Sequence, residues 1–329
     1  MFMKSLTTGL AAMLLLAPQL ASAKDLKLAD FQPPTHFVAE KGYKKFAETI
    51  AEKTGGEVTV TVYMGGELGA GPAEQYSRAV EGVADIAFGL PGYTASNFPV
   101  TLLSELPGVI QADTGTERIM ANIDLLSSEY RRVVLLGLWN NAPNLLMTAN
   151  KPVRSMADVK GLKLRVPSRN AGLVVSAWGG TPVSMPASEV YNAMQTGVID
   201  GAMIDATALG AFKLEEVTKY ITMGMDTTIS DFFVIMNRDS FEGLTDDQQQ
   251  IVMDAGRQLA LDGNAAWLGI ADKSVADFAA RDGKEVITLT PEAAAEFNAA
   301  SAPVVEQVVA EVDGQGLNGS AYVKALKGE

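Results

Sequence analysis

The amino-acid sequence predicts an α/β fold in two lobes, with mixed sheets flanked by helices and one long helix that spans the lobes. Strand-like and helix-like segments alternate over residues 25–149, and a second run of this kind begins at residue 163. An alanine-rich helical pattern then covers residues 245–280. Such alternation is typical of right-handed βαβ units and mainly parallel sheets.

The first α/β unit begins with the alternating segment DLKLADF at residues 25–31, which predicts a strand. Apolar residues at helical spacing follow and end at Thr54-Gly55-Gly56, a typical helix stop. The other segments of this unit are predicted as helices at 37–53, 72–81 and 114–130 and as strands at 58–63, 85–88, 133–139 and 145–149.

The second unit begins at the apolar segment 163–166, which is followed by a helical pattern after Ser168. Its strands are predicted at 182–184, 199–203, 220–223 and 232–236, with a helix at 188–196 and a mostly helical tail at 291–327.

The chain passes from the first unit to the second and then returns. This indicates that each lobe is built from two separate stretches of the sequence. We expect residues 24–147 with about 236–277 to form lobe I, and 148–235 with about 278–329 to form lobe II. Ligands of open α/β sheets bind in crevices at the carboxyl ends of strands. The cleft between the lobes is therefore the predicted site.

The first 23 residues have the pattern of a signal peptide. Lys4 precedes an apolar core of about 8 to 12 residues, and Ala21-Ser22-Ala23 supplies the small-x-small cleavage pattern. A membrane-spanning helix needs about 20 apolar residues. We therefore expect a mature protein of about 306 residues, exported to the periplasm and soluble.

The chain is strongly acidic, with 26 basic and 39 acidic residues and a net charge of −13. Loss of Lys4 with the leader makes this −14. A phosphate-binding surface needs clustered Lys and Arg, so nucleic acid is not an expected partner. An anionic ligand would need a local, oriented cation.

Catalytic and metal-binding signatures are absent from the sequence. There is no cysteine and only one histidine, His36, which excludes thiol nucleophiles and multi-histidine metal sites. The sequence contains no G-x-S-x-G, Walker A, S-x-x-K or H-E-x-x-H pattern. We expect neither an enzyme nor a bound cofactor, and we predict no metal-ligating residues; whether a metal ion bridges the ligand to the protein stays open.

Arg165 is the strongest candidate for ligand binding. It ends a short apolar strand in Gly161-Leu162-Lys163-Leu164-Arg165-Val166-Pro167, where its side chain would reach the crevice. A guanidinium there can make a bidentate, charge-assisted pair with a carboxylate. A solvated arginine at a strand end is the competing interpretation.

Three motifs make the sequence recognisable. They are DVKGLKLRVP at 158–167, GTPVSMP at 180–186 and SEVYNAMQTGVIDG at 188–201, supported by ADIAF at 84–88 and VIMN at 234–237. Together they resemble the DctP-type solute-binding proteins of tripartite ATP-independent periplasmic (TRAP) transporters. The resemblance extends across the mature chain.

This resemblance implies a class II-like periplasmic binding protein that closes on its ligand and delivers it to TRAP permease subunits in the membrane. The family's arginine at the LRVP position clamps the ligand carboxylate, and Arg165 occupies that position. A monomer is the expected state.

Departures from the family pattern point to the ligand. Leu145 stands where sugar-acid receptors carry a second arginine, and Met203 and Ile204 replace polar contact positions. Unpaired hydroxyls against such residues would each cost about 1–3 kcal/mol, whereas an apolar body gains on burial. We therefore expect a small monocarboxylate with a flat or apolar body, such as a hydroxybenzoate.

The remaining candidate ligand contacts lie at strand ends and cleft loops. They are Phe31, His36, Phe88, Tyr93, Trp139, Asn141, Met203, Asp205 and Phe232. Phe232 and Phe233 point to opposite faces of one strand, so only one of them can meet the ligand.

Other functions stay open at this stage. The ligand could be a sugar acid or an aliphatic hydroxy or keto acid, the receptor could report to a membrane kinase, or the protein could be a secreted hydrolase. Turnover of a substrate would favour the hydrolase. A neighbouring kinase gene would favour the sensor.

Overall fold

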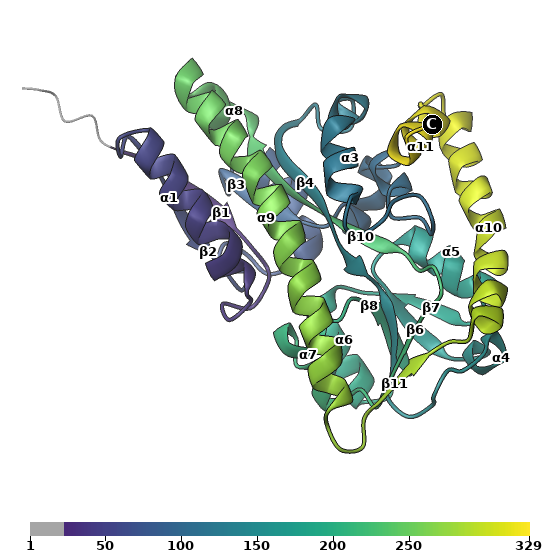
Figure 1. The fold of residues 1–329 in the computed structure, drawn as a ribbon. Helices are drawn as coiled ribbons and strands as arrows, with labels where there is room; N and C mark the ends of the chain where they lie inside the picture. The colour runs from purple at the N-terminus through teal and green to yellow at the C-terminus, as the bar shows by residue number, and fades with distance from the viewer. Residues whose placement is uncertain (1–22) are drawn as a thin grey trace, which may run out of the picture.

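The computed structural model describes residues 23–329, which form two lobes around two separate sheets (Figure 1). The predicted signal peptide lies outside the described residues, apart from Ala23. In the part of the chain that is described, no helix is long and apolar enough to cross a bilayer.

Lobe I is built on a five-stranded sheet of order β2-β1-β3-β10-β4. The first three strands in this order are parallel, and β10 runs antiparallel to β3 and β4. Alternation in β1 puts Leu26 and Leu28 into the core. The strands are β1 (Lys24–Ala29), β2 (Val58–Tyr63), β3 (Ile86–Gly89), β4 (Val133–Pro143) and β10 (Ile229–Asn237).

Lobe II is built on a six-stranded sheet of order β11-β9-β5-β8-β6-β7. Strand β5 runs antiparallel to β8 and β9, whereas β6 is parallel to β7 and β8. The strands are β5 (Leu145–Thr148), β6 (Lys163–Val166), β7 (Thr181–Ser184), β8 (Gly201–Ile204), β9 (Tyr220–Met223) and β11 (Glu285–Thr288).

The predicted α/β class, with two mixed sheets and a long helix, is confirmed, but the strands at the crossings belong to different sheets than expected. Strand β10, most of which was assigned to lobe II, pairs with β3 and β4 in lobe I. Strand β5, assigned to lobe I, pairs with β8 and β9 in lobe II. Each strand contains a continuous apolar run, Leu145–Met147 in β5 and Phe232–Met236 in β10, and nothing in such a run marks where the chain leaves one sheet for the other.

The C-terminal tail stays with lobe II through α10, and only its last helix returns to lobe I. Helix α10 (Pro291–Gly314) packs on α5 (Arg169–Ala177), where the Trp178 Nε1–H donates to the Phe297 carbonyl at 3.1 Å. Helix α11 (Gly319–Lys327) instead contacts α3 (Gly115–Ala121), and Arg118 Nη1 donates to the Leu326 carbonyl at 2.6 Å.

The other helices are short and cover the sheet faces. The helix expected over 114–130 is interrupted after α3, because Asn122 leaves helical geometry and its Nδ2 donates to the Arg118 carbonyl. The remaining helices are α1 (Lys44–Lys53), α2 (Gln75–Val80), α4 (Met156–Val159), α6 (Ala187–Gln195), α7 (Ala208–Ala211) and α8 (Arg238–Glu242). Short π- or 3₁₀-helical turns are η1 (Ala39–Tyr43), η2 (Pro72–Glu74), η3 (Pro91–Asn97), η4 (Thr101–Leu103), η5 (Ile123–Leu126) and η6 (Leu214–Glu216).

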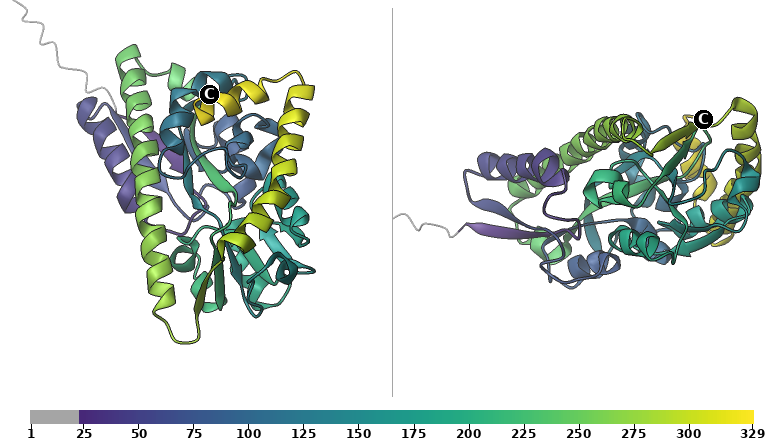
Figure 2. Two further views of the ribbon diagram at one scale, coloured as in Figure 1. Left: turned by 45° about the vertical axis from the view of Figure 1, so that its right-hand side comes forward. Right: turned by 90° about the horizontal axis from the view of Figure 1, so that it is seen from below.

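Helix α9 (Asp246–Ala279) runs along both lobes, while α10 lies on the opposite side of the molecule (Figures 1 and 2). A capping box between Thr245 and Gln248 starts α9. Its Trp267 packs in the core of lobe I and its Phe278 in the core of lobe II. Gly256 lets the helix approach β4, because a Cβ there would lie 2.6 Å from the Leu136 carbonyl oxygen.

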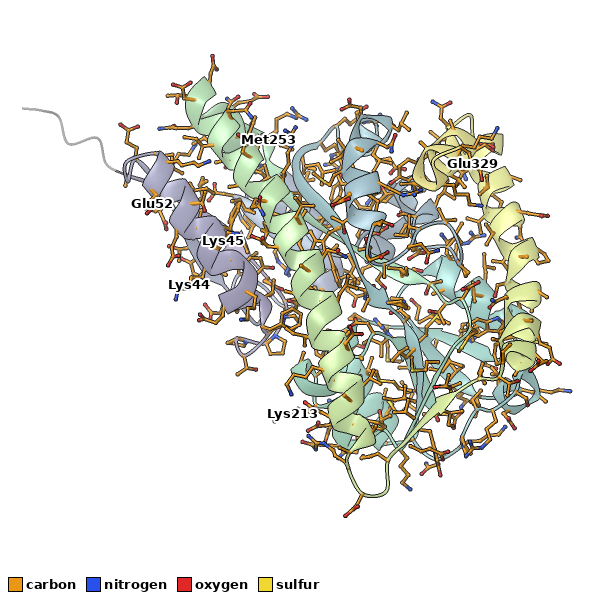
Figure 3. The ribbon with its side chains drawn as sticks, in the orientation of Figure 1. Lys44, Lys45, Glu52, Lys213, Met253 and Glu329 are labelled. Carbon is orange, nitrogen blue, oxygen red and sulfur yellow. The ribbon has the colours of Figure 1, made fainter. Side chains whose placement is uncertain are left out.

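Charged side chains project from the outer surface of α1 (Figure 3). Lys44, Lys45 and Glu52 lie on α1, and Lys45 Nζ bonds Asp262 of α9 at 2.6 Å. Exposed pairs of this kind contribute little to stability. The fold is held mainly by the apolar cores of the two lobes.

Candidate functional site

A small cavity lies between the two lobes. Both lobes and the segments that cross between them contribute to its wall. The lining residues are Phe31, Gln32, His36, Leu90, Tyr93, Asn141, Asn144, Arg165, Pro167, Ala187, Ile204, Asp205, Thr207, Ala208, Phe212, Ser230, Phe232 and Trp267.

Arg165 places a buried cation in the cavity wall. It lies in β6 between β8 and β7, in register with Ala202 and Val183, and it is only 1% exposed. Its Nε donates to the Met185 carbonyl at 2.9 Å, and Nη1 donates to the Met203 carbonyl at 3.3 Å. Burial lowers its pKa, yet an arginine keeps its charge in proteins.

The Arg165 charge has no carboxylate partner within 4 Å among residues 23–329. Its hydrogen-bond acceptors are two backbone carbonyls and the Tyr93 hydroxyl, all of them neutral. A desolvated charge held only by dipoles attracts an opposite charge strongly. This end of the cavity is therefore suited to an anion.

Tyr93 connects the lobes at the same end of the cavity. It lies in the η3 turn of lobe I, and its hydroxyl oxygen accepts from Ala187 N at 2.9 Å and from Arg165 Nη2 at 3.3 Å, both in lobe II. Because both of these contacts use the oxygen as an acceptor, the hydroxyl hydrogen can be donated to a bound anion.

Asp205 belongs to a network that ties lobe II to both crossing strands. Its carboxylate accepts from Thr207 N and from Asn141 Nδ2, each at 2.9 Å. Asn141 lies in β4, and its Oδ1 accepts from Ser230 N of β10 at 2.8 Å. Burial raises the pKa of Asp205. Since both carboxylate oxygens already accept hydrogen bonds, Asp205 holds neighbouring residues of the cavity wall in place.

His36 is a neutral member of the wall. Burial lowers its pKa to about 3, and its Nδ1 accepts from Val38 N at 3.2 Å. The proton must then be on Nε2, which can act as a donor. The ring stacks on Phe37 at 4.3 Å and lies 5.4 Å from Trp267.

Aromatic rings form one side of the cavity. Phe232 lies 4.7 Å from Trp267 between ring centroids, and both rings line the cavity together with Phe31. Phe88 and Trp139, expected as ligand contacts, pack behind Phe232 at 5.3 Å and 5.9 Å. They support the wall from the core of lobe I.

The structure brings seven of the ten predicted site residues to the cavity wall: Arg165, His36, Tyr93, Phe31, Asn141, Asp205 and Phe232. Phe233 packs in the core on the other face of β10. Phe88, Trp139 and Met203 do not line the cavity. The Met203 backbone carbonyl holds Arg165, while its Sδ accepts from Thr228 Oγ1 at 3.3 Å.

Two of the three apolar replacements predicted to contact the ligand do not reach the cavity. Of Leu145, Met203 and Ile204, only Ile204 lines the cavity. Leu145 packs in the core of lobe II, and neighbours along a strand point to opposite faces. The apolar character of the site comes instead from the aromatic wall, Leu90 and Ile204.

Sequence reasoning missed several residues of the wall. Thr207 and Ala208 follow β8, so the strand-end rule that selected Arg165 also applies to them. Trp267 was missed because its position on α9 carries no sign of the cavity. Gln32 and Asn144 were missed because each follows a strand end as one polar residue among several.

A family model for bacterial extracellular solute-binding proteins, family 7 (DctP), matches residues 29–312. The uncharacterized protein YiiZ of Salmonella typhimurium is 31% identical over 67% of this chain and 68% of its own length. The ectoine/5-hydroxyectoine-binding periplasmic protein UehA of Ruegeria pomeroyi is 29% identical over 87% of this chain and 85% of its own. A solute-binding protein of Albidiferax ferrireducens is matched over 65% of its length.

Two solved structures share the whole architecture. A TRAP solute-binding protein specific for aromatic acids, from an unidentified marine microbe and in complex with 3-hydroxybenzoate, is 27% identical with a TM-score of 0.87, covering 93% of this chain and 98% of its own. A TRAP periplasmic solute-binding protein of Bordetella bronchiseptica with bound mandelate is 25% identical with a TM-score of 0.84, covering 93% and 98%.

Proposed function

The chain belongs to family 7 of the bacterial extracellular solute-binding proteins, the DctP-type receptors of TRAP transporters, and we propose that its ligand is a small aromatic monocarboxylate. Members of this family bind solutes and are not enzymes. The proposal concerns the ligand, its mode of capture and its destination.

The observation that carries the proposal is the buried charge of Arg165 in a cavity with an aromatic wall. The guanidinium lacks a carboxylate partner among the described residues, while Phe31, Phe232 and Trp267 offer flat apolar surface. A ligand carboxylate would neutralise the guanidinium, and an aromatic ring of the ligand would be buried against the flat apolar surface.

Two structural relatives support an aromatic body. The marine protein binds 3-hydroxybenzoate and the Bordetella protein binds mandelate, each a carboxylate with one aromatic ring. Other relatives bind different solutes, such as ectoine in the case of UehA. Family membership therefore leaves the ligand open, and the chemistry of this cavity favours an aromatic acid.

Capture would proceed by closure of the lobes. The carboxylate would bind Arg165 of lobe II and accept a hydrogen bond from the Tyr93 hydroxyl of lobe I. A ligand that contacts both lobes stabilises the closed state over the open one. The closed receptor would then deliver the acid from the periplasm to a TRAP permease, as a monomer.

A calorimetric and thermal-shift panel tests the proposed ligand class. Mature protein would be titrated with benzoate, hydroxybenzoates, mandelate, aliphatic hydroxy and keto acids, and sugar acids. A ligand present far above its Kd stabilises the native state by several kcal/mol. We expect an aromatic acid to bind most tightly. A sugar acid or aliphatic acid that binds at least tenfold more tightly than every aromatic acid would overturn the proposal.

A further inference from the structure

We propose that the cavity selects aromatic acids whose ring carries a hydroxyl or amino group, and that Asn144 and Gln32 recognise this hydrogen-bond donor. The inference rests on the proposed function and names the second polar group of the ligand. It starts from two buried side-chain oxygens in the cavity wall that have no hydrogen-bond partner.

The orientation of the Asn144 amide is set by its neighbours. The Thr228 hydroxyl donates its hydrogen to Met203 Sδ at 3.3 Å. Because thioether sulfur can only accept, the Thr228 oxygen is left to accept, and it does so from Asn144 Nδ2 at 3.0 Å. Ser230 Oγ takes the second contact of Nδ2, at 3.3 Å.

This arrangement leaves Asn144 Oδ1 without a donor. The residue is 1% exposed and lines the cavity, and its Oδ1 has no partner among the described residues. Its backbone is equally constrained, because Asn144 N donates to the Thr228 carbonyl at 3.1 Å. The amide therefore cannot turn away without losing its contacts with Thr228 and Ser230.

Gln32 supplies a second acceptor from lobe I. Its backbone N–H donates to Asp30 Oδ1 at 2.8 Å, and its carbonyl accepts from Gly65 N at 2.7 Å. The residue is 3% exposed and lines the cavity, and no donor in residues 23–329 contacts its Oε1. The two acceptors thus come from different parts of the fold.

A buried acceptor left unpaired costs about 1–3 kcal/mol. A ligand hydroxyl or amino group would donate to the acceptor and remove that cost. An unsubstituted ring has no donor, so the acceptor would stay unpaired in the complex. Sites built to hydrogen-bond a ligand group reject the analogue that lacks it. The expected discrimination between a substituted and a plain aromatic acid is roughly 10- to 100-fold in Kd.

Calorimetry on matched ligands tests this inference. The set is benzoate, the three hydroxybenzoates, the three aminobenzoates, and the fluorobenzoates, which add small substituents without a donor. We expect at least one hydroxy or amino isomer to bind ten times or more tightly than benzoate and the matching fluorobenzoate.

Two variants locate the acceptor. Asn144→Leu and Gln32→Met each remove one unpaired oxygen while keeping the side-chain volume similar. At least one should reduce the ratio of the benzoate Kd to the Kd of the donor-bearing isomer to less than threefold. Thermal unfolding of each variant without ligand shows whether the variant is folded. Gln75→Met is the control, because Gln75 is a buried unpaired amide on α2 outside the cavity wall.

The outcomes separate this inference from the proposed function. Benzoate binding as tightly as every hydroxy and amino isomer would overturn the inference and leave the aromatic-acid proposal intact. A donor preference that survives both substitutions, or that Gln75→Met also abolishes, would overturn the assignment to Asn144 and Gln32. Failure of every aromatic acid to bind would overturn both proposals together.

Discussion

Two buried polar regions lie side by side between the lobes, and they handle charge in opposite ways. One is the cavity end around Arg165. The other is a cluster of Ser104, Glu105, Ser168 and Asp231, which we call the carboxyl cluster. Ser168 is three residues from Arg165 in sequence, and its hydroxyl donates to Glu105 Oε1 at 2.7 Å.

The acids of the carboxyl cluster can lose their own charge by protonation. Burial raises the pKa of Glu105 to about 8, with a smaller contribution from the nearby Asp231 carboxyl, and burial raises the pKa of Asp231 to about 7. Ser104 donates to Asp231, and no cation within 4 Å pairs with either acid in the described chain. A carboxyl group can lose its charge by taking a proton.

Arg165 has no such route, because a guanidinium stays protonated. Asp205 attracts this charge from beyond ion-pair distance, so an anion that bonds the guanidinium directly would have to come from a ligand. Burial of an ionisable group is therefore not itself a sign of a binding site. The sign is a buried charge that cannot be removed by protonation and lies in the wall of a cavity.

Removal of the cation should have the largest effect on binding. Arg165→Ala deletes the charged partner of the ligand carboxylate, which should weaken the Kd of the tightest aromatic acid about a thousandfold, or about 4 kcal/mol. Isothermal calorimetry measures this change. Arg169→Ala is the control, since Arg169 is exposed and pairs with Glu311 at 2.9 Å. Equal losses in both variants would contradict the account.

The carboxyl cluster should make the unfolding free energy of the protein depend on pH. The pKa of Glu105 is raised from 4.5 to about 8 on folding, so its stabilising contribution is full below the unfolded pKa and is lost as pH rises toward 8. Glu105→Gln removes this loss. The unfolding free energy of the variant relative to wild type should rise by on the order of 3 kcal/mol between about pH 5.5 and about pH 8.

Denaturant melts at several pH values measure that difference. Glu40→Gln, on an exposed side chain of η1, serves as the control. A relative stability of Glu105→Gln that stays constant with pH would mean that Glu105 is ionised in the folded protein.

Tyr93 joins the lobes at the charged end of the cavity, so Tyr93→Phe tests whether this hydroxyl also binds the ligand. Loss of a hydrogen bond to a charged group costs about 1.5–3 kcal/mol, so the Kd should rise about 10- to 100-fold. Tyr191→Phe is the matched control, because its hydroxyl donates to Glu216 at 2.7 Å on the surface. An unchanged Kd in Tyr93→Phe would exclude the hydroxyl from ligand binding.

The smallest expected effect comes from the close approach of the lobes at Gly92. A Cβ there would lie 3.0 Å from Ser168 Cβ and 3.1 Å from the Pro167 carbonyl oxygen. Gly92→Ala should hinder closure and raise the Kd several-fold, to about tenfold. Gly210→Ala is the control, since a Cβ at Gly210 meets nothing within 4 Å. Unchanged binding in Gly92→Ala would show that closure tolerates a methyl group there.

The sequence predicted the parts of this account that depend on local pattern. Alternation and helical spacing predicted most strands and helices, and the position of Arg165 before Pro167 at a strand end predicted its place at the cleft. The Thr245–Ala280 pattern predicted α9 to within a residue at each end.

The rest depends on contacts between distant segments. Nothing local decides that β10 pairs with β3, or that Leu145 faces the core while Asn144 faces the cavity. The unpaired oxygen of Asn144 is visible only once Thr228 and Met203 are placed beside it. Pairing between remote strands, rather than propensity, determines these features.

The most direct test of the central claim compares an acid with its neutral amide on the wild-type protein. The tightest aromatic acid and the corresponding carboxamide have nearly the same shape, and they differ in the charge presented to Arg165. Calorimetry should show the acid binding at least about a hundredfold more tightly than the amide. Affinities within tenfold of each other would contradict the claim that Arg165 holds an unbalanced charge for the ligand.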